Sequence, residues 1–332
     1  MNANQLFLLV SLCYLFAISA HCDAKEKQNS TLSILTLNLH TYQEISTAGK
    51  KESDLNRNDA LKRVSDYDPI FNTIAKGIDE LDPDIICLQE VGEWKENTAK
   101  TIKKTSEDIY SFGLDSSNAV NQLLTRIKSD KYSYYMDWSH YGWDVWKEGT
   151  AILSKYPILE KESRYISDTN NGTYSFWQSR KVTRVKVKTS DSKVINIFSV
   201  HSGWWDSEKE PFKSQFNRLM EWVHQIESKN EEIILCGDFN QPSNSKGYMQ
   251  ITNENDFVDT YLSTNRYGML DLTVNINADG WKGNQNAKRI DYIFIEANSD
   301  FSVKRSERVF TSKKFGIVSD HVGIFTILTA HD

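Results

Sequence analysis

The chain has 332 residues, of which 39 are Lys or Arg and 45 are Asp or Glu, so its formal net charge is −6 at pH 7. A mildly acidic chain lacks the broad basic surface that is usual for tight nucleic-acid binding, although a nuclease needs only a local basic groove. Beyond the N-terminus no segment is apolar for long enough to cross a bilayer, so stable membrane insertion is not expected.

The first 24 residues predict a secretory leader. The apolar run from Leu6 to Ala20 has the length of a signal-peptide core and is short for a membrane span. Small residues suitable for cleavage end at Ala20 and at Ala24, but no Lys or Arg precedes them, and an uncleaved anchor is the alternative. We therefore predict a signal peptide at 1–24 and a single domain at 25–332, in a protein that is secreted, or periplasmic in a bacterium.

Secretion would affect two further features. The sequons that begin at Asn29 and Asn171 would carry glycans in a eukaryotic host. Cys87 and Cys236 lie within apolar runs, where buried free thiols are the usual outcome, and a disulfide between them is the alternative in an oxidising compartment.

The first half of the chain predicts strands separated by polar segments. Residues 33–39 form a short apolar run with strand character, and the polar residues 44–68 predict a surface insertion. The segment from Pro69 to Leu81 has apolar residues at helical spacing and ends before Pro83. Residues 92–130 predict helix and loop, and further strands are predicted at 84–88, 150–153 and 183–187.

The second half adds one clear helix and more strands. Apolar residues recur at spacings of three and four from Pro211 to Ile226, which predicts a helix. Strands and helices alternate only partly along the chain, so mixed sheets with outer helices are favoured over a parallel α/β sheet. The predicted strands are 194–200, 232–236, 289–295 and 323–328.

Acids, amides and imidazoles stand at the ends of most predicted strands. A carboxylate near a core is costly unless it is paired, and one such strand end would be ordinary, but six within one chain predict convergence on a shared ion and substrate. Carboxylate and amide oxygens suit hard cations, so Mg²⁺ or Mn²⁺ is expected and Ca²⁺ is less favoured. The residues at these ends are Asn38, Glu90, His201, Asp238, Asn240, Asp291, Asp320 and His321.

Seven short motifs along the chain resemble, in their order, those of the endonuclease/exonuclease/phosphatase superfamily, the deoxyribonuclease I-like hydrolases. They are TLNLH at 36–40, LQEV at 88–91, GTAILSKYPI at 149–158, SVHSG at 199–203, GDFN at 237–240, RIDYIF at 289–294 and SDH at 319–321. The resemblance implies an α+β fold, a four-layer α/β/β/α sandwich in which two mixed β-sheets pack face to face with helices outside.

The resemblance also implies a metal site in an enzyme that hydrolyses a phosphate ester. Glu90 would be the principal metal ligand, with Asn38 beside it, and Asp320 would add to the site or orient its neighbour. A divalent cation there would neutralise charge on a phosphate, which is the main need of phosphoryl transfer.

The remaining roles implied by the resemblance concern the phosphate and the attacking water. His321, with its ring held by Asp291, and His201 would contact the scissile phosphate. Asp238 would orient or deprotonate the water, although the His321–Asp291 pair is an alternative general base. Asn240 would stabilise the charge that develops in the transition state. No Ser or Cys nucleophile is required, so direct attack by water is the simplest mechanism.

Aromatic residues cluster near these motifs and predict a flat apolar wall at the mouth of the site. Such rings stack on sugars or on bases. The candidate substrate-binding residues are His140, Trp143, Trp204 and Trp205. Arg180, Lys181 and Arg184 are either phosphate contacts or charges that alternate along an edge strand.

The substrate is less constrained than the chemistry. The stretches NLHTYQE, SHYGWDVWKEGTAIL and HSGWWDSEKEPF most resemble the bacterial branch that includes maltose 6'-phosphate phosphatase. That resemblance implies a phosphorylated small molecule, a sugar phosphate above all, as the substrate. The alternatives are a deoxyribonuclease I-like secreted endonuclease acting on nucleic acid, a sphingomyelinase-like phosphodiesterase, and a non-catalytic binding protein on the same fold.

Overall fold

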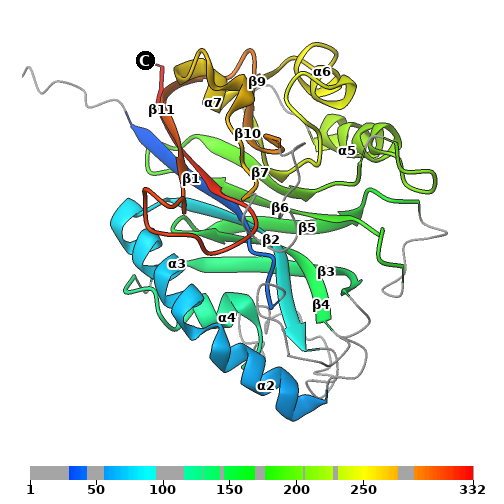
Figure 1. The fold of residues 1–332 in the computed structure, drawn as a ribbon. Helices are drawn as coiled ribbons and strands as arrows, with labels where there is room; N and C mark the ends of the chain where they lie inside the picture. The colour runs from blue at the N-terminus through cyan, green and yellow to red at the C-terminus, as the bar shows by residue number, and fades with distance from the viewer. Residues whose placement is uncertain are drawn as a thin grey trace, which may run out of the picture.

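Two six-stranded β-sheets pack face to face, with helices on both outer faces (Figure 1). The computed structural model describes residues 30–42, 56–94, 116–129, 131–142, 146–168, 176–204, 206–226, 231–275 and 288–331. Parallel and antiparallel neighbours occur in both sheets. The predicted four-layer α/β/β/α sandwich is therefore confirmed.

The first sheet has the strand order β11-β12-β1-β2-β4-β3. Helices α2 (Arg57–Asp66), α3 (Asp68–Leu81) and α4 (Ala119–Leu124) cover its outer face. Its strands are β1 (Thr31–Asn38), β2 (Ile85–Trp94), β3 (Ser133–Gly142), β4 (Trp146–Ser154), β11 (Phe301–Val309) and β12 (Gly323–Ala330).

The second sheet has the order β5-β6-β7-β8-β10-β9. Helices α5 (Phe212–Ile226) and α6 (Lys246–Thr252) pack on its outer face, and α7 (Thr260–Thr264) and a 3₁₀ turn η2 (Gly268–Leu270) follow β9. Its strands are β5 (Ile158–Tyr165), β6 (Lys181–Lys188), β7 (Val194–His201), β8 (Glu231–Asp238), β9 (Phe257–Asp259) and β10 (Asp291–Glu296).

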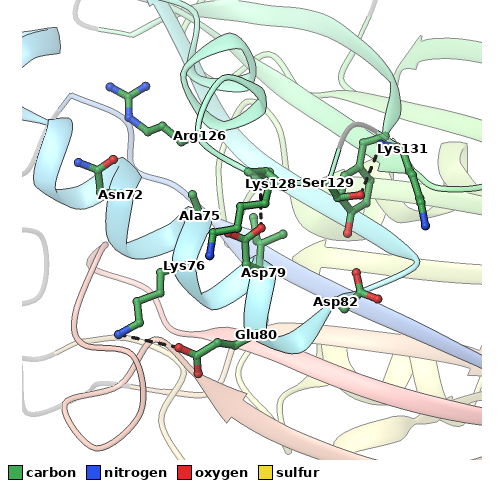
Figure 2. A pocket seen from close by; sticks show the side chains of 13 residues that line it. Asn72, Ala75, Lys76, Asp79, Glu80, Asp82, Arg126, Lys128, Ser129 and Lys131 are labelled. Carbon is green, nitrogen blue, oxygen red and sulfur yellow. Dashed lines mark hydrogen bonds and ion pairs between the residues drawn. The ribbon is translucent and has the colours of Figure 1, made fainter.

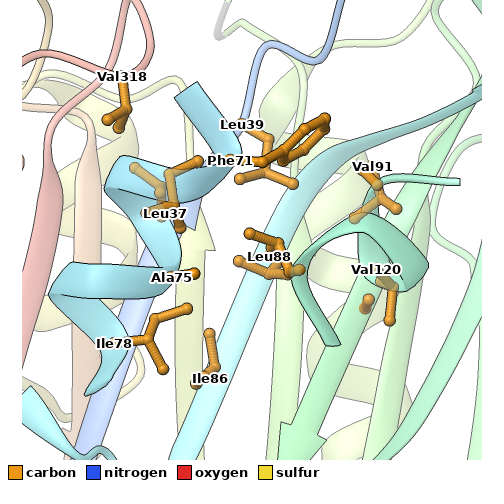
Figure 3. Packing of buried hydrophobic residues seen from close by; sticks show 14 of the residues in the cluster. Leu37, Leu39, Phe71, Ala75, Ile78, Ile86, Leu88, Val91, Val120 and Val318 are labelled. Atoms are coloured by element: carbon orange, nitrogen blue, oxygen red, sulfur yellow. The ribbon is translucent and has the colours of Figure 1, made fainter. Parts of the chain in front are cut away.

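Helix α3 shows how the outer layers are held. Pro69 lies in its first turn, where a missing backbone N–H costs nothing, and the left-handed Asp82 (φ 46°) ends it. Phe71, Ala75 and Ile78 lie on its buried face and contact Leu37, Ile86 and Leu88 of the sheet (Figure 3). The apolar spacing in the sequence therefore predicted both the helix and its buried face.

Three parts of the chain differ from the prediction. Residues 44–68 were predicted to be a surface insertion with no helix assigned, but α2 begins at Arg57, after the N-cap Asn56, whose side chain caps the helix together with Asp59. Only Leu61 and Val64 are large apolar residues in α2, so its periodicity is weak. Within 92–130, β2 continues to Trp94. Strands β3, β5 and β11 were missed because their side chains are largely half-exposed or charged.

The strand directions bring one set of strand ends to the same edge of the sandwich. β1 runs parallel to β2, and β7 runs parallel to β8, so these four strands end together. β10 and β12 are antiparallel to their neighbours and begin where those strands end. Asp291 therefore pairs directly with Asp238, and His201 pairs with Asp238 from the other side.

Cys87 and Cys236 are free thiols buried in the core between the two sheets. Among the described residues no helix is both long and apolar enough to span a membrane. The predicted signal peptide at 1–24, the glycosylation acceptors Asn29 and Asn171, and the aromatic residues Trp143 and Trp205 lie outside the described residues.

Gly237 tests the close packing of β7 on β8. Its φ is +142°, and a Cβ atom there would lie 1.9 Å from the carbonyl oxygen of Val200. Gly237→Ala should lower the free energy of unfolding by about 3 kcal/mol, because the clash adds to backbone strain. The control is Gly316→Ala, where φ is +98° but the nearest atom would be 3.9 Å away. Gly316→Ala should lower the free energy of unfolding by about 1 kcal/mol, because only the backbone strain is present. Urea unfolding would measure both, and equal losses would contradict the packing argument.

Candidate active site

The alternation of side chains along each strand aims the candidate residues into the space between the sheets. In β8, Ile234 and Cys236 belong to the core between the sheets, so Asp238 faces the same way. In β10, Ile293 and Ile295 also belong to the core between the sheets, so Asp291, two residues before Ile293, faces that core as well. Asn38 in β1 and His201 in β7 each lie four residues after a core residue, Ile34 and Ile197, so their side chains also point between the sheets.

Glu90 reaches this space only because β2 contains a β-bulge. Leu88 pairs with Ala151 and Val91 pairs with Gly149, so Gln89 and Glu90 together oppose one residue of β4. Glu90 has a φ of +48°, an uncommon value for a residue with a side chain. As a result two consecutive side chains face the second sheet: Gln89 donates to Ser199 at 3.0 Å, and the carboxylate of Glu90 lies 3.9 Å from His201 Nε2.

Asn38 holds two carboxylates together. Its Nδ2 donates to Glu90 Oε1 at 3.0 Å and to Asp238 Oδ2 at 3.1 Å. Its Oδ1 accepts a hydrogen bond from the backbone N–H of His40 at 3.0 Å, which sets the orientation of the amide. In this arrangement Asn38 acts as a donor between the two acids, and its role as a metal ligand stays a prediction.

His321 and Asp291 form the pair that the sequence led us to expect. His321 Nδ1 lies 2.9 Å from Asp291 Oδ2, and both side chains are buried. The other ring nitrogen, Nε2, lies 3.7 Å from Asp238 and 3.8 Å from Asp320. Burial opposes a charge on the ring, but Asp291, Asp320 and Asp238 outweigh it and raise the pKa of His321 well above its usual range. These three acids therefore favour the imidazolium form of the ring.

His201 has the opposite electrostatic state. Its Nε2 lies 3.8 Å from Asp238 Oδ2. Burial, followed by the positive charges of Arg180, His140 and His321, lowers the pKa of His201 well below its usual value. The two candidate phosphate-contacting histidines therefore carry different charges at neutral pH.

The acids of the site have raised proton affinity. Burial is the main cause of the raised pKa of Glu90, and Glu148 and Asp320 add to it, against His40 and Asn38. Burial also raises the pKa of Asp238 to about 7, with Asp291 and Glu90 adding to the effect against His321 and the backbone N–H of Asn240. A bound cation would stabilise the charged form of these acids.

Two groups of side chains have the spacing of metal ligands. Glu90, His201 and Asp238 offer ligand atoms that all lie within 4.8 Å of one another, and Asp238, Asp291 and His321 form a second such group. Both contain carboxylates, which are suitable for hard divalent cations.

Residues 36–321 match the Endonuclease/Exonuclease/phosphatase family. The chain belongs to this family. The motif order in the sequence had predicted the membership, and proteins of the endonuclease/exonuclease/phosphatase family hydrolyse phosphoester bonds.

Similar proteins span several substrates within the endonuclease/exonuclease/phosphatase family. The chain is 24% identical over 217 residues to the uncharacterized protein YbhP of Escherichia coli K12, covering 65% of this chain and 69% of YbhP. It is 24% identical over 209 residues to human sphingomyelin phosphodiesterase 2, covering 57% of this chain and 49% of that enzyme.

Solved structures of the same fold include two bacterial proteins. An endonuclease/exonuclease/phosphatase family protein from Leptotrichia buccalis superposes with a TM-score of 0.65 at 24% identity, covering 89% of this chain and 98% of that chain. A mannosyl-6-phosphatase from Bacteroides thetaiotaomicron superposes with a TM-score of 0.57 at 18% identity, covering 90% of this chain and 99% of that chain. These superpositions show the shared fold.

Asn240 and Asp320 lie beside the other predicted residues. The backbone N–H of Asn240 donates to Asp238 Oδ1 at 2.8 Å, and its side-chain amide donates to the carbonyl of Ser202 at 2.9 Å. Asp320 Oδ1 lies 3.3 Å from Nδ1 of His40, a residue with a φ of +44°. His40 was not singled out from the sequence, although it lies two positions after Asn38 in the first motif.

The predicted aromatic wall is only partly formed by the residues expected. Trp204 is 42% exposed, and its ring lies 6.2 Å from that of Trp177, which is 52% exposed. His140 does not belong to this wall: it is buried, with Nε2 at 3.3 Å from Glu148 and Nδ1 at 3.1 Å from the carbonyl of Ser179. A buried acid partner explains its position, and this pairing between two strands could not be predicted from the local sequence pattern.

A separate open pocket of about 660 Å³ lies between α3 and the segment that follows α4 (Figure 2). Its charges compensate one another: Lys76 pairs with Glu80 at 3.8 Å, and the backbone N–H of Lys128 donates to Asp79 at 2.9 Å. None of the predicted site residues lines it, so the strand ends remain the candidate active site.

The electrostatic role of Asp291 can be measured directly. Asp291→Asn removes the largest favourable charge from the His321 ring, so the pKa of His321 should fall. The proton NMR titration of that ring in EDTA-treated protein should then have its midpoint at lower pH than in the wild type. Asp300→Asn, an exposed acid paired with Lys193 on β7's preceding loop, is the matched control and should leave the midpoint unchanged. An unchanged midpoint in Asp291→Asn would contradict the assigned pairing.

Proposed function

We propose that the protein is a secreted, divalent-metal-dependent phosphoesterase that hydrolyses a sugar phosphate, or another small phosphomonoester, by direct attack of water. The observation that carries this proposal is the meeting of Glu90, His201, Asp238 and His321 from both sheets around one small volume. The apolar N-terminal segment supports secretion.

The donor set fits a hard divalent cation. Glu90 would hold it, with Asp238 near and with Asn38 and Asp320 beside them. Burial, to which neighbouring acids add, raises the pKa values of Glu90 and Asp238, and a bound cation would favour their charged forms. Oxygen donors favour Mg²⁺ or Mn²⁺ over softer metals. When bound, the cation supplies Lewis-acid polarisation of a phosphate oxygen.

The chain's own residues supply the remaining chemistry. Asp238, with a pKa of about 7, is suited to orient the attacking water and to accept its proton near neutral pH. His321 is an imidazolium and can donate to a phosphate oxygen from Nε2, because Asp291 occupies Nδ1. Nε2 of His201 lies 3.8 Å from Asp238 Oδ2, the same oxygen that His321 Nε2 approaches to 3.7 Å. Asn240 would stabilise the charge that develops on the phosphate.

Two exposed indole rings support a sugar phosphate. Trp204 follows His201 by three residues, and its ring lies 6.2 Å from that of Trp177 at an interplanar angle of 57°. The apolar face of a pyranose ring packs well on such surfaces. The mannosyl-6-phosphatase of similar fold gives independent support for this class of substrate.

A phosphodiesterase is the second candidate. The similarity to human sphingomyelin phosphodiesterase 2 favours it, since the exposed indole rings are also compatible with a lipid. A panel assay with Mg²⁺ and Mn²⁺ would separate the two, using sugar phosphates, sphingomyelin, RNA, and single- and double-stranded DNA, each with an EDTA control. Turnover of sugar phosphates above the other substrates would support the proposal, and turnover of sphingomyelin or nucleic acid alone would replace it.

Glu90→Gln tests the metal site. The substitution keeps the shape of the side chain but removes its charge, so kcat/KM should fall by about a thousandfold and Mn²⁺ binding should be lost. Glu221→Gln on the exposed face of α5 is the matched control and should retain activity. Activity in Glu90→Gln equal to that of the control would remove Glu90 from the site.

Trp204→Ala tests the aromatic wall. Loss of one stacking ring should raise the KM for the sugar phosphate by about tenfold, with kcat changed little. Leu159→Ala removes an exposed apolar side chain at the opposite end of the second sheet and is the control. Equal KM values in the two variants would show that Trp204 makes no contact with substrate.

A further inference from the structure

Three basic residues stand at the start of β6, and the structure separates their roles. Lys181 Nζ lies 3.0 Å from the carboxylate of Asp137, and Arg184 Nη2 lies 2.9 Å from that of Glu160. Arg180 has no carboxylate within 4.0 Å among the residues that the structure describes. The sequence left all three open as phosphate contacts, but only Arg180 lacks an acid partner.

Arg180 is nevertheless buried. Its Nη1 donates to the carbonyl oxygens of Trp177 at 2.9 Å and Ser179 at 3.1 Å, while its Nε is buried without a hydrogen-bond acceptor among the described residues. Buried cations in proteins are almost always paired with an anion, and buried N–H groups nearly always have an acceptor. Among the residues that the structure describes, Arg180 therefore carries a charge without an acid partner and a donor without an acceptor.

The surroundings of Arg180 show which way its charge acts. The acids that influence it are Glu90, Glu148, Asp238 and Glu210, none of them in direct contact. After burial, the positive charge of Arg180 is the largest cause of the lowered pKa of His201. β6 runs antiparallel to β7 with Thr183 opposite Ser199, so Arg180, which precedes β6, lies at the edge of the sheet where His201 and Asp238 lie. No carboxylate of the described residues lies within 4.0 Å of its guanidinium.

We propose that Arg180 binds the phosphate group of the substrate. This inference rests on the proposed function, and it adds a residue that contacts the substrate to those of the predicted site. A guanidinium matches phosphate geometry through its N–H donors, and a phosphate would supply the counter-charge that Arg180 lacks among the described residues.

The same side chain connects the phosphate to the aromatic wall. Its Nη1 holds the carbonyl of Trp177, whose ring lies 6.2 Å from that of Trp204. A phosphate on Arg180 and a sugar ring on the two indoles would therefore lie on neighbouring surfaces. This arrangement fits a substrate with one charged end and one apolar face, as in a hexose phosphate.

Inorganic phosphate, the expected product, is a direct probe. Its binding to the full chain would be measured by calorimetry, with EDTA and with Mg²⁺. Arg180→Gln should weaken phosphate binding by tenfold or more under both conditions, since a charge-assisted hydrogen bond is lost. Lys181→Gln is the matched control: the adjacent base already has Asp137 as its partner, so phosphate binding should equal that of the wild type. Equal affinities in Arg180→Gln and the wild type would overturn the proposal.

A structural role would give different results. If Arg180 only holds the carbonyls of Trp177 and Ser179, then Arg180→Gln and Arg180→Lys would both lose the fold, or would keep it and bind phosphate normally, and either result would overturn the proposal. If Arg180→Gln alone fails to fold, Arg180→Lys decides: weaker phosphate binding supports the proposal, and unchanged binding overturns it.

Failure of this proposal is distinct from failure of the proposed function. Wild-type protein that hydrolyses sugar phosphates while Arg180→Gln binds phosphate normally would remove Arg180 alone. Wild-type protein that hydrolyses no phosphate ester would remove the proposed function, and the calorimetric comparison would still decide whether Arg180 binds phosphate.

Discussion

The organisation of the site depends on keeping three carboxylates close together between two apolar sheets. Glu90, Asp238 and Asp291 would repel one another, and burial raises the pKa of Glu90 and of Asp238. Hydrogen-bond donors offset this repulsion while the acids stay close together. Asn38 donates to Glu90 and Asp238, and His321 pairs with Asp291. The apolar residues below them, among them Ile34, Ile197, Cys236 and Ile293, hold the sheets in register so that these donors meet their acids. Charge that is concentrated in this way is suited to a divalent cation, and the site needs both sheets to form.

Much of this arrangement could be predicted from the sequence, because it follows from the period of two along a strand. Asn38, Asp238 and Asp291 each lie an even number of residues from core residues of the same strand, such as Ile34, Cys236 and Ile293, and so share the face that those residues bury. Glu90 is different, since strict alternation would point it away from the second sheet, and a bulge opposite β4 restores its direction. A bulge depends on pairing between distant strands, which single-sequence patterns do not contain. The family motif identified Glu90 without explaining how it reaches the site.

The helices, strands and ion pairs that the sequence did not predict were missed for related physical reasons. Strands β5 and β11 carry alternating charges on exposed surfaces, and α2 has too few apolar residues for a clear helical period. The pairing of His140 with Glu148, and of Lys181 with Asp137, joins residues from different strands and depends on the tertiary fold. For the same reason Arg180 became distinct only when the partners of its two neighbours were known. The local sequence pattern thus predicted which polar residues stand at strand ends. The tertiary packing determines which of them have a hydrogen-bond or ion-pair partner.

The central claim is that acids from both sheets share one divalent cation. Anomalous diffraction from crystals soaked in Mn²⁺ tests it most directly, because the anomalous signal locates the ion without reference to activity. The account predicts a strong peak within bonding distance of the Glu90 carboxylate, on the side that faces Asp238, at about 2.0–2.2 Å from its oxygen ligands. Saturating Mn²⁺ with no peak between β2 and β8, or with peaks only at surface acids, would contradict it.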